Sequence, residues 1–510
     1  MSNVLGSAPH RVALRKIFLS GTALLSAALF GLATPASADQ QFLKHGSLVI
    51  SSSTYDGSQG KVAALVANQT PLPGPSTAVS DSNYVTVWNN EGPDASFGVT
   101  SVIQLTDIDL SNGRVFRSMQ VPTDQVVTSF SSKSELGLHV LNNRPTVSVV
   151  FVGYAGAGVG NLDASNSDAV AGQDPTNPVT HAFGNNFAFR RTIVSVDEKG
   201  SITYTPTIDY GGNNGRSALL GSNGLYYMVG NANNGNASTF GSTNGTNPDV
   251  TQTTGLVVVN PIGSSVVNAT IPSATSAEVD PSLQFQLNKN NTLDKPGKDN
   301  NYRGITEFGG ALYFTKGSGS NGMDTVYTVK APNSLPTLAN AANSQIEVVP
   351  GFPTDSARTT GGDFTPFAVF FANANTMYVS DEGTGDATDV SQHAGLQKWT
   401  LGSDGNWHLQ YVLTKGLIGV VDKVTGFDGP WPTITTTGLR NLTGRINGNG
   451  TVTLWATTST SSASTDNGAD PNKAVEITDQ IAATQVGNES FTTVAGPVYG
   501  TVFRGVGFVE

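Results

Sequence analysis

Four segments of the sequence open an alternating apolar run with an arginine followed by a small residue. A guanidinium group presents rigid, paired donors that match a carboxylate or a phosphate. Arginines at one position of a repeated strand should lie at one height, so we expect them to form an anion-binding cluster. The open alternative is that each arginine pairs with an acid or a carbonyl of a neighbouring repeat and only braces the fold. The segments are GRSALL with Arg216, YRGITEF with Arg303, LRNLTGR with Arg440 and FRGVGFVE with Arg504.

An acidic segment, MYVSDEGTGDATD, supplies the opposite charge. Asp381 and Glu382 end its apolar run, and either carboxylate could serve as a catalytic general acid or base. Asp381, Asp386 and Asp389 could instead place oxygen ligands around Ca²⁺ on a glycine-containing loop. The alternative is that this stretch is a solvated acidic loop.

The composition excludes several classes of function. The 510 residues include 38 Asp and Glu, 27 Lys and Arg, and no Cys, for a net charge of −11. Without cysteine there is no disulfide, thiolate metal site or cysteine nucleophile. Nucleic-acid binding depends on clustered positive charge. We therefore expect no nucleic-acid partner.

The first 38 residues have the pattern of a Sec-type signal peptide. Arg11, Arg15 and Lys16 precede an apolar run, and Ala36 and Ala38 frame a cleavage site. This pattern predicts export, with a periplasmic or secreted protein that has no membrane contact after cleavage. Residues 39–510 show no linker or composition shift, so we expect one domain. We also expect a monomer.

Internal repeats indicate the architecture. A segment in which apolar and polar residues alternate before a run of small residues occurs six times. The copies begin near residues 48, 149, 225, 312, 377 and 453. Each copy extends to four strands. The arginine segments are the first strands of four copies, and 134–140 and 365–371 are the first strands of the other two. In the third copy, 265–271 is the predicted fourth strand.

The copies at the two ends complete one another. The last copy stops after its first strand at the C-terminus, and its other three strands stand at the mature N-terminus. The sequence therefore predicts an all-β, six-bladed β-propeller of four-stranded antiparallel blades, closed by pairing the N- and C-terminal strands in one blade.

The pattern resembles exported six-bladed propellers at large. Sialidases are of this kind. They hold an acid substrate with an arginine cluster and carry S-x-D-x-G-x-T-W turns between third and fourth strands. Here the turn GSDGNW (402–407) has Ser403, Asp404, Gly405 and Trp407, but its Asp and Gly are adjacent. The resemblance thus implies the architecture and no specific enzyme family.

Long predicted loops converge on one face of this propeller, and such loops are often functional. We therefore favour a hydrolase or lyase that acts on an anionic small molecule or acidic glycan, with the arginines binding the anion and Asp381 or Glu382 as acid and base. The alternative is a non-catalytic propeller that binds a ligand, glycan or protein of the cell envelope. A second carboxylate or a Tyr–carboxylate pair beside the arginines would favour the enzyme.

Overall fold

The computed structural model describes most of the chain from residue 41 onward, all of it within one compact unit, Ala33–Glu510. The described residues contain no α-helix, and they therefore include no helix that is long and apolar enough to cross a membrane. The structure describes residues 41–55, 69, 79–80, 88–89, 100–130, 132, 134–142, 146–156, 158–159, 190–210, 214–231, 254–268, 270–279, 301–317, 323–330, 334–354, 364–385, 393–425, 433–461 and 468–510.

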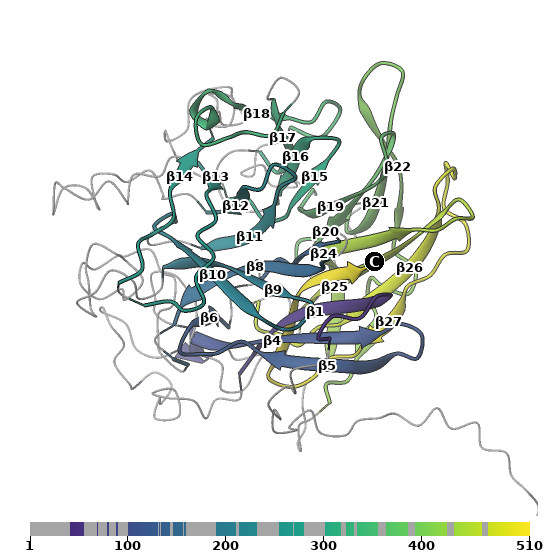
Figure 1. Ribbon diagram of the computed structural model, residues 1–510. Coiled ribbons are helices and arrows are strands. Elements are labelled where there is room, and N and C mark those ends of the chain that lie inside the picture. The colour runs from purple at the N-terminus through teal and green to yellow at the C-terminus, as the bar shows by residue number, and fades with distance from the viewer. Residues whose placement is uncertain are drawn as a thin grey trace, which may run out of the picture. The chain divides into compact units, whose positions relative to one another are not determined.

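The described strands form antiparallel sheets around a common axis (Figure 1), which confirms the predicted all-β propeller. Four sheets of four or five strands are separate, and one nine-stranded sheet holds the strands that we divide into a first and a second blade. Alternating strands with short hairpins favour this arrangement because each sheet can bury both faces against its neighbours. From the axis outward, the third to sixth blades are β11 (Gly215–Leu220), β12 (Tyr226–Gly230), β13 (Leu256–Val259) and β14 (Ser276–Glu278); β15 (Ile305–Phe308), β16 (Ala311–Lys316), β17 (Thr325–Lys330) and β18 (Gln345–Val348); β19 (Pro366–Asn373), β20 (Thr376–Asp381), β21 (Gly395–Leu401) and β22 (Trp407–Leu413); and β24 (Ile434–Ile446), β25 (Thr451–Ser461), β26 (Ala474–Gln480) and β27 (Thr492–Ala495).

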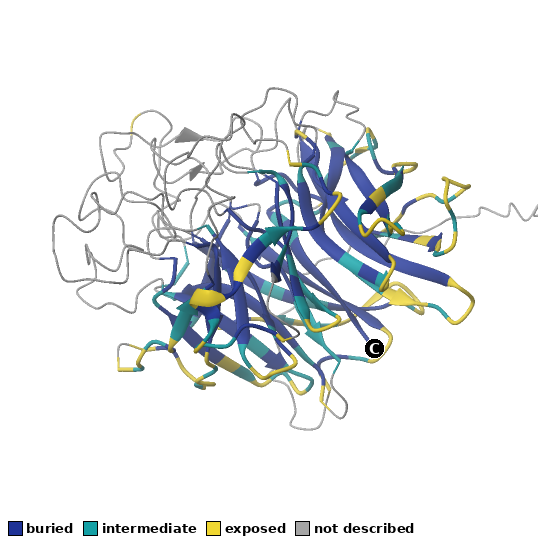
Figure 2. Ribbon diagram, turned by 90° about the horizontal axis from the view of Figure 1, so that it is seen from above, coloured by how far each residue is buried: buried dark blue, intermediate teal, exposed yellow. Residues whose placement is uncertain are grey.

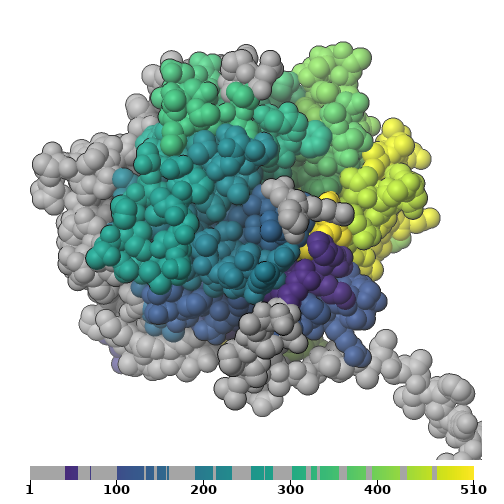
Figure 3. All heavy atoms as spheres, viewed as in Figure 1, coloured from purple at the N-terminus to yellow at the C-terminus, as the bar shows by residue number. Residues whose placement is uncertain are grey.

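The first blade is built from both ends of the chain, as predicted. The C-terminal strand is antiparallel to the N-terminal one, with Ser47 opposite Val509. Figure 3 shows the purple N-terminal strand beside the yellow C-terminal region. The pairing closes the ring of blades and covers the inner edge of β1. The strands of this blade are β28 (Thr501–Val509), β1 (Ser47–Thr54), β4 (Thr100–Asp109) and β5 (Arg114–Gln120).

The second blade is joined to the first, and this differs from the prediction of six separate sheets. The short strand β6 (Val126–Ser129) pairs with β4 on one side and with β8 on the other. Hydrogen bonding therefore links two blades into one nine-stranded sheet, and four blades remain as sheets of their own. The second blade consists of β7 (His139–Leu141), β8 (Ser148–Ala155), β9 (Arg191–Asp197) and β10 (Ile202–Thr207).

The fourth strand of the third blade was wrongly predicted at 265–271. The backbone of Ser264 pairs with Tyr204 of β10, and Val267 is buried in the core of the second blade. This segment packs on the neighbouring blade, so the strand forms later, at β14. The remaining elements are β2 (Val79–Ser80), β3 (Trp88–Asn89), β23 (Val421–Asp422), which pairs with β24, and the 3₁₀ turn η4 (Ala341–Asn343).

Neighbouring blades are held together by hydroxyl groups near the axis. The second strand of four blades carries a Ser or Thr that donates a hydrogen bond to a carbonyl of the next blade's innermost segment. These strands are buried, as Figure 2 shows, so each hydroxyl satisfies an acceptor that water cannot reach. The pairs are Ser51 with Leu136, Thr315 with Phe367, Ser380 with Arg440, and Thr457 with Arg504.

Glycines lie where the innermost segments of neighbouring blades approach closely. A Cβ on Gly505 would lie 2.4 Å from the carbonyl oxygen of Leu136, and one on Gly304 would lie 2.4 Å from that of Phe367. A Cβ on Gly137 would lie 2.7 Å from Ser217 Oγ. Any side chain at Gly505 or Gly304 would push the neighbouring blade away, which explains the glycine after Arg504 and Arg303.

Candidate functional site

The four predicted arginines lie on the innermost segments of four blades. Arg216 is on β11, Arg440 on β24 and Arg504 on β28, and Arg303 comes two residues before β15. All four are buried, with at most 7% of their surface exposed. A buried charge is costly unless other groups compensate it. The partners of each arginine therefore decide its role.

Glu382 joins two of the arginines. Arg303 Nη1 lies 2.5 Å from Glu382 Oε1, and Arg440 Nε lies 3.2 Å from Oε2. The three side chains come from three successive blades and are all buried. One carboxylate thus bridges the fourth and sixth blades from its place just after β20. Arg303 and Arg440 therefore make the cross-blade ion pairs that the bracing alternative expects.

A second glutamate, Glu135, is buried in the second blade, just before its innermost strand β7. It accepts hydrogen bonds from Thr128 Oγ1 at 2.9 Å, from the Ser129 amide at 3.2 Å and from Asn214 Nδ2 at 3.0 Å. The hydroxyl of Tyr154, at the end of β8, donates a further hydrogen bond to Glu135 Oε1. A Tyr–carboxylate pair is therefore fixed in the blade next to that of Arg216.

Sequence reasoning missed Glu135 and Tyr154. The backbone of Gly137 pairs with Ser217, so Leu136, not Glu135, is the equivalent of Arg216. Leu136 has a φ of 57°, which shifts the chain out of register with the arginine strands. The repeats did contain a signal for Tyr154. Tyr154 and Glu382 stand at the same position of their repeats, and the other four copies have Gly, Ser or Thr there, so a large polar side chain at this position is unusual.

The charges follow a fixed order around the axis. By blade, starting from the first, the residues are Arg504, Glu135, Arg216, Arg303, Glu382 and Arg440. We call these six residues the axial cluster. Each glutamate has an arginine on either side, and two pairs of arginines are direct neighbours: Arg216 with Arg303, and Arg440 with Arg504. Four positive charges face two negative ones.

Burial and like charge act together on the arginines. Burial, and then repulsion from Arg303, lower the pKa of Arg216 to about 9. Burial, and then repulsion from Arg440, lower the pKa of Arg504 to about 9. Burial also lowers the pKa of Arg440, against the attraction of Glu382 and of the nearby Asp470. All three remain protonated at neutral pH, so the cluster keeps its excess of positive charge.

Arg216 and Arg504 differ in how far their donors are used. Arg504 donates to Ser53 Oγ at 3.2 Å and to the carbonyls of Phe130 and Gly468. Arg216 makes one long hydrogen bond, 3.4 Å, to the Tyr302 carbonyl. Its Nε has no partner among the described residues.

Asn214, two residues before Arg216, also has a hydrogen-bonding atom that the described residues leave unused. Its Nδ2 serves Ser132 and Glu135, and its Oδ1 has no partner among the described residues. A buried donor and a buried acceptor without partners are costly unless a ligand or water meets them. Arg216 and Asn214 thus leave hydrogen-bonding capacity to spare side by side, whereas Arg504, whose Nη1 also has no partner among the described residues, already makes three hydrogen bonds.

Asp381 is buried, and its carboxylate is fully engaged. It accepts hydrogen bonds from the Thr365 amide and hydroxyl, from the Gly383 amide at 2.9 Å and from Gln397 Nε2 at 3.0 Å. Burial nevertheless raises its pKa to about 6. These contacts fix the end of β20, from which Glu382 projects.

The predicted calcium site cannot be assembled from what the structure describes. Asp386 and Asp389 lie outside the described residues. Within the described part of the chain, no group of three or more His, Cys, Asp or Glu side chains is placed to hold a metal ion. The calcium site stays a prediction.

The turn that carries the sialidase resemblance lies between β21 and β22, at the hairpin of an outer strand. Asp404 accepts hydrogen bonds from the Asn406 amide at 3.1 Å and from His408 Nε2 at 3.1 Å. These bonds close the turn upon itself. The residues of this turn therefore have a local structural role.

No family model and no curated protein matches the sequence. Among solved structures, a GH43_1 enzyme from Xanthomonas citri complexed with xylose is 10% identical, with a TM-score of 0.27 over 65% of this chain and 88% of that chain. A GH43 β-xylosidase/α-arabinofuranosidase from a compost microbial metagenome is 10% identical, with a TM-score of 0.29 over 72% and 92%. A PL25 ulvan lyase is 9% identical, with a TM-score of 0.28 over 86% and 95%. Similarity at this level carries no inference about activity.

Proposed function

We propose that this chain is an exported protein that binds an anionic small molecule or an acidic glycan at the axial cluster and acts on it as a hydrolase or lyase. One observation carries the proposal: four buried arginines and two buried glutamates lie near enough to affect one another's charge, and Arg216 has only one long hydrogen bond among the described residues. The excess positive charge draws an anion because opposite charges attract strongly where water is excluded.

Arg216 is the arginine best suited to the ligand. Arg303 and Arg440 are committed to Glu382, and Arg504 is held by three oxygen atoms of the protein. A ligand carboxylate at Arg216 would accept from Nε and offset the repulsion from Arg303. A ligand hydroxyl could donate to Asn214 Oδ1. The site therefore suits a sugar acid, which offers both groups.

Tyr154 and Glu135 are the candidate reacting groups. When a tyrosine hydroxyl donates to a carboxylate, the carboxylate can take the proton while the phenol oxygen acts as a base or nucleophile. We assign this role to the pair in preference to Asp381 and Glu382. The carboxylate of Asp381 is filled by protein donors, and that of Glu382 is held by two arginines.

A non-catalytic binding protein is the second candidate function. Glu135 already accepts four hydrogen bonds, and Glu382 lies in two ion pairs. Carboxylates held in this way are suited to fixing a ligand site and are less free to move protons. Turnover separates the two candidates.

The experiment is a panel of uronates, sialic acid, sulfated sugars and phosphoesters, screened by thermal shift and by product formation with acidic oligosaccharides. A ligand at 100 times its Kd should stabilise the protein by about 2.7 kcal/mol. Arg216→Met keeps the side-chain volume and should abolish the shift. Arg114→Ala, at an exposed arginine of β5, is the matched control. If an anion stabilises the wild type and Tyr154→Phe equally and no product forms, the result would support the binding protein. If no anion stabilises the wild type, both candidate functions would be refuted.

A further inference from the structure

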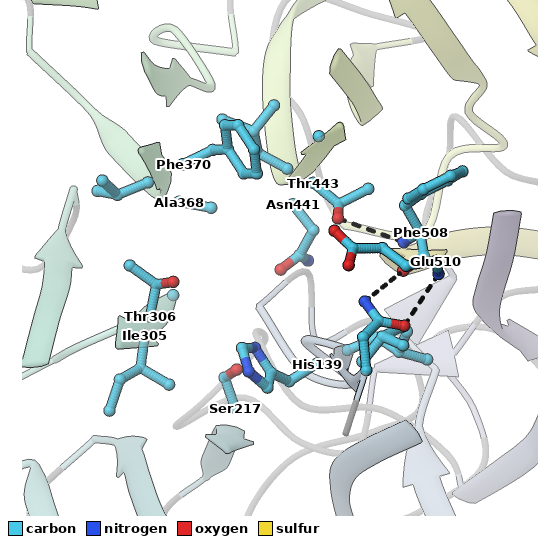
Figure 4. A pocket seen from close by; sticks show the side chains of 17 residues that line it. His139, Ser217, Ile305, Thr306, Ala368, Phe370, Asn441, Thr443, Phe508 and Glu510 are labelled. Atoms are coloured by element: carbon cyan, nitrogen blue, oxygen red, sulfur yellow. Dashed lines mark hydrogen bonds between the residues drawn. The ribbon is translucent and has the colours of Figure 1, made fainter. Parts of the chain in front are cut away.

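A cavity lies among the innermost strands of the blades, and none of the six residues of the axial cluster lines it. It has a volume of about 190 Å³ and is lined by residues from all six blades (Figure 4). Ser217, Gly304 and Asn441, which directly follow three of the arginines, line it together with Glu510, whereas the arginines themselves do not.

The polar groups around this cavity have hydrogen-bonding capacity that the protein does not use. Among the described residues, the side chains of His139, Ser217, Thr306 and Glu510 make no hydrogen bond with another residue. Asn441 donates through Nδ2 to the Arg504 carbonyl at 2.7 Å and leaves its Oδ1 unused. Figure 4 shows these five side chains around the same space. Hydroxyl, imidazole, amide and carboxylate groups together are suited to hydrogen bonds with a polar ligand.

The lining also excludes one class of ligand. It contains no lysine or arginine, and its one acidic residue is Glu510. An anion would meet no positive lining side chain there and would face the Glu510 carboxylate. Burial lowers the pKa of His139 to about 4, so its imidazole is neutral at pH 7. Ile305 and Phe370 supply apolar surface between the polar groups.

We propose that this axial cavity is a second binding site, for a neutral polyhydroxylated small molecule. Its hydroxyl groups would donate to Glu510, Asn441 Oδ1 and His139, and exchange hydrogen bonds with Ser217 and Thr306, while its C–H faces pack on Ile305 and Phe370. A cavity of about 150 Å³ holds a benzene ring. The size therefore suits a polyol of about five carbons.

The test uses ribitol as the neutral probe and ribonate as its anionic counterpart of the same carbon number. Protein labelled on its histidines is titrated with each compound while the imidazole signals are followed by NMR, with His139 assigned from its loss in His139→Gln. Ribitol should shift the His139 signal saturably, and ribonate should not. Because a lost hydrogen bond weakens binding by about three- to tenfold, Thr306→Val and Ser217→Ala should each raise the Kd of ribitol by that factor.

Two controls separate this site from the axial cluster and from general effects. Thr492→Val, at an exposed threonine of β27, should leave the Kd unchanged. Arg216→Met should also leave it unchanged, because Arg216 does not line this cavity. No saturable shift of His139 with ribitol, an equal response to ribonate, or an unchanged Kd in Thr306→Val would overturn the proposal and leave a channel that holds water only.

Discussion

Replacing Glu382 with glutamine tests whether two of the arginines brace the ring of blades. The substitution keeps the shape of the side chain and removes the charge that Arg303 and Arg440 share at 2.5 and 3.2 Å. Both arginines would stay buried and charged. Breaking one buried pair costs about 3–5 kcal/mol, which is a large part of a total stability of about 5–15 kcal/mol.

We therefore expect Glu382→Gln to lower the free energy of unfolding by about 3–5 kcal/mol. At about 2.1 cal/mol/K per residue, the unfolding entropy of roughly 470 residues is about 1 kcal/mol/K, so the melting temperature should fall by about 3–5 °C. Urea unfolding at pH 7 measures the first quantity and calorimetry the second. Added sulfate should restore part of the loss, since an anion can replace the missing charge.

The matched control is Glu198→Gln, at a half-buried glutamate in the turn after β9 that makes no ion pair among the described residues. It should change the free energy of unfolding by less than about 0.5 kcal/mol. If Glu382→Gln behaved like this control, the bridge between Arg303 and Arg440 would contribute nothing to stability. The division of the arginines into bracing and ligand-binding members would then be wrong.

Three further predictions concern burial, the axis and the ring closure. Burial raises the pKa of Asp381 in the folded protein to about 6 from a usual 3.8, so the folded protein binds more protons than the unfolded chain between pH 4 and 6. The contribution of Asp381 to the free energy of unfolding should therefore fall by about 2–3 kcal/mol as pH rises through that window. Urea unfolding of the wild type and of Asp381→Asn over this range should show the change, and a difference between the two proteins that does not vary with pH would contradict it. Gly505→Ala should cost about 1–3 kcal/mol because its Cβ would lie 2.4 Å from the Leu136 carbonyl, whereas Gly448→Ala, with nothing within 4 Å, should be neutral in the same unfolding assay. Deleting residues 501–510 removes β28 and exposes the inner edge of β1, so a truncated protein that kept the wild-type melting temperature would refute the closure.

Much of the fold could be predicted from the sequence because propeller blades are local repeats. Each blade is a run of alternating strands joined by short turns, and the unit recurs six times, so one pattern is tested repeatedly. The closure by β1 and β28 followed from the count of strands alone. The joined sheet was not predictable, because β6 is four residues long and its pairing with two blades is decided by position in space.

The site was predicted in part for a similar reason. Arg216, Arg303, Arg440 and Arg504 stand at one position of a regular strand, so the repeat reveals them. Glu135 stands beside a residue of positive φ that breaks the register, and no repeat position marks it. The partners of each arginine also come from other blades. Which arginine braces the ring and which keeps a free donor depends on those contacts.

The most direct test of the central claim is isothermal titration of the wild-type protein and Arg216→Met with the tightest anion of the panel at low salt. Binding of one anion per chain to the wild type, and loss of at least a hundredfold in affinity in Arg216→Met with an unchanged melting temperature, would agree with an anion held at the axial cluster. That factor is about 2.7 kcal/mol, within the range for a charged hydrogen bond. Equal affinity in the two proteins would contradict it.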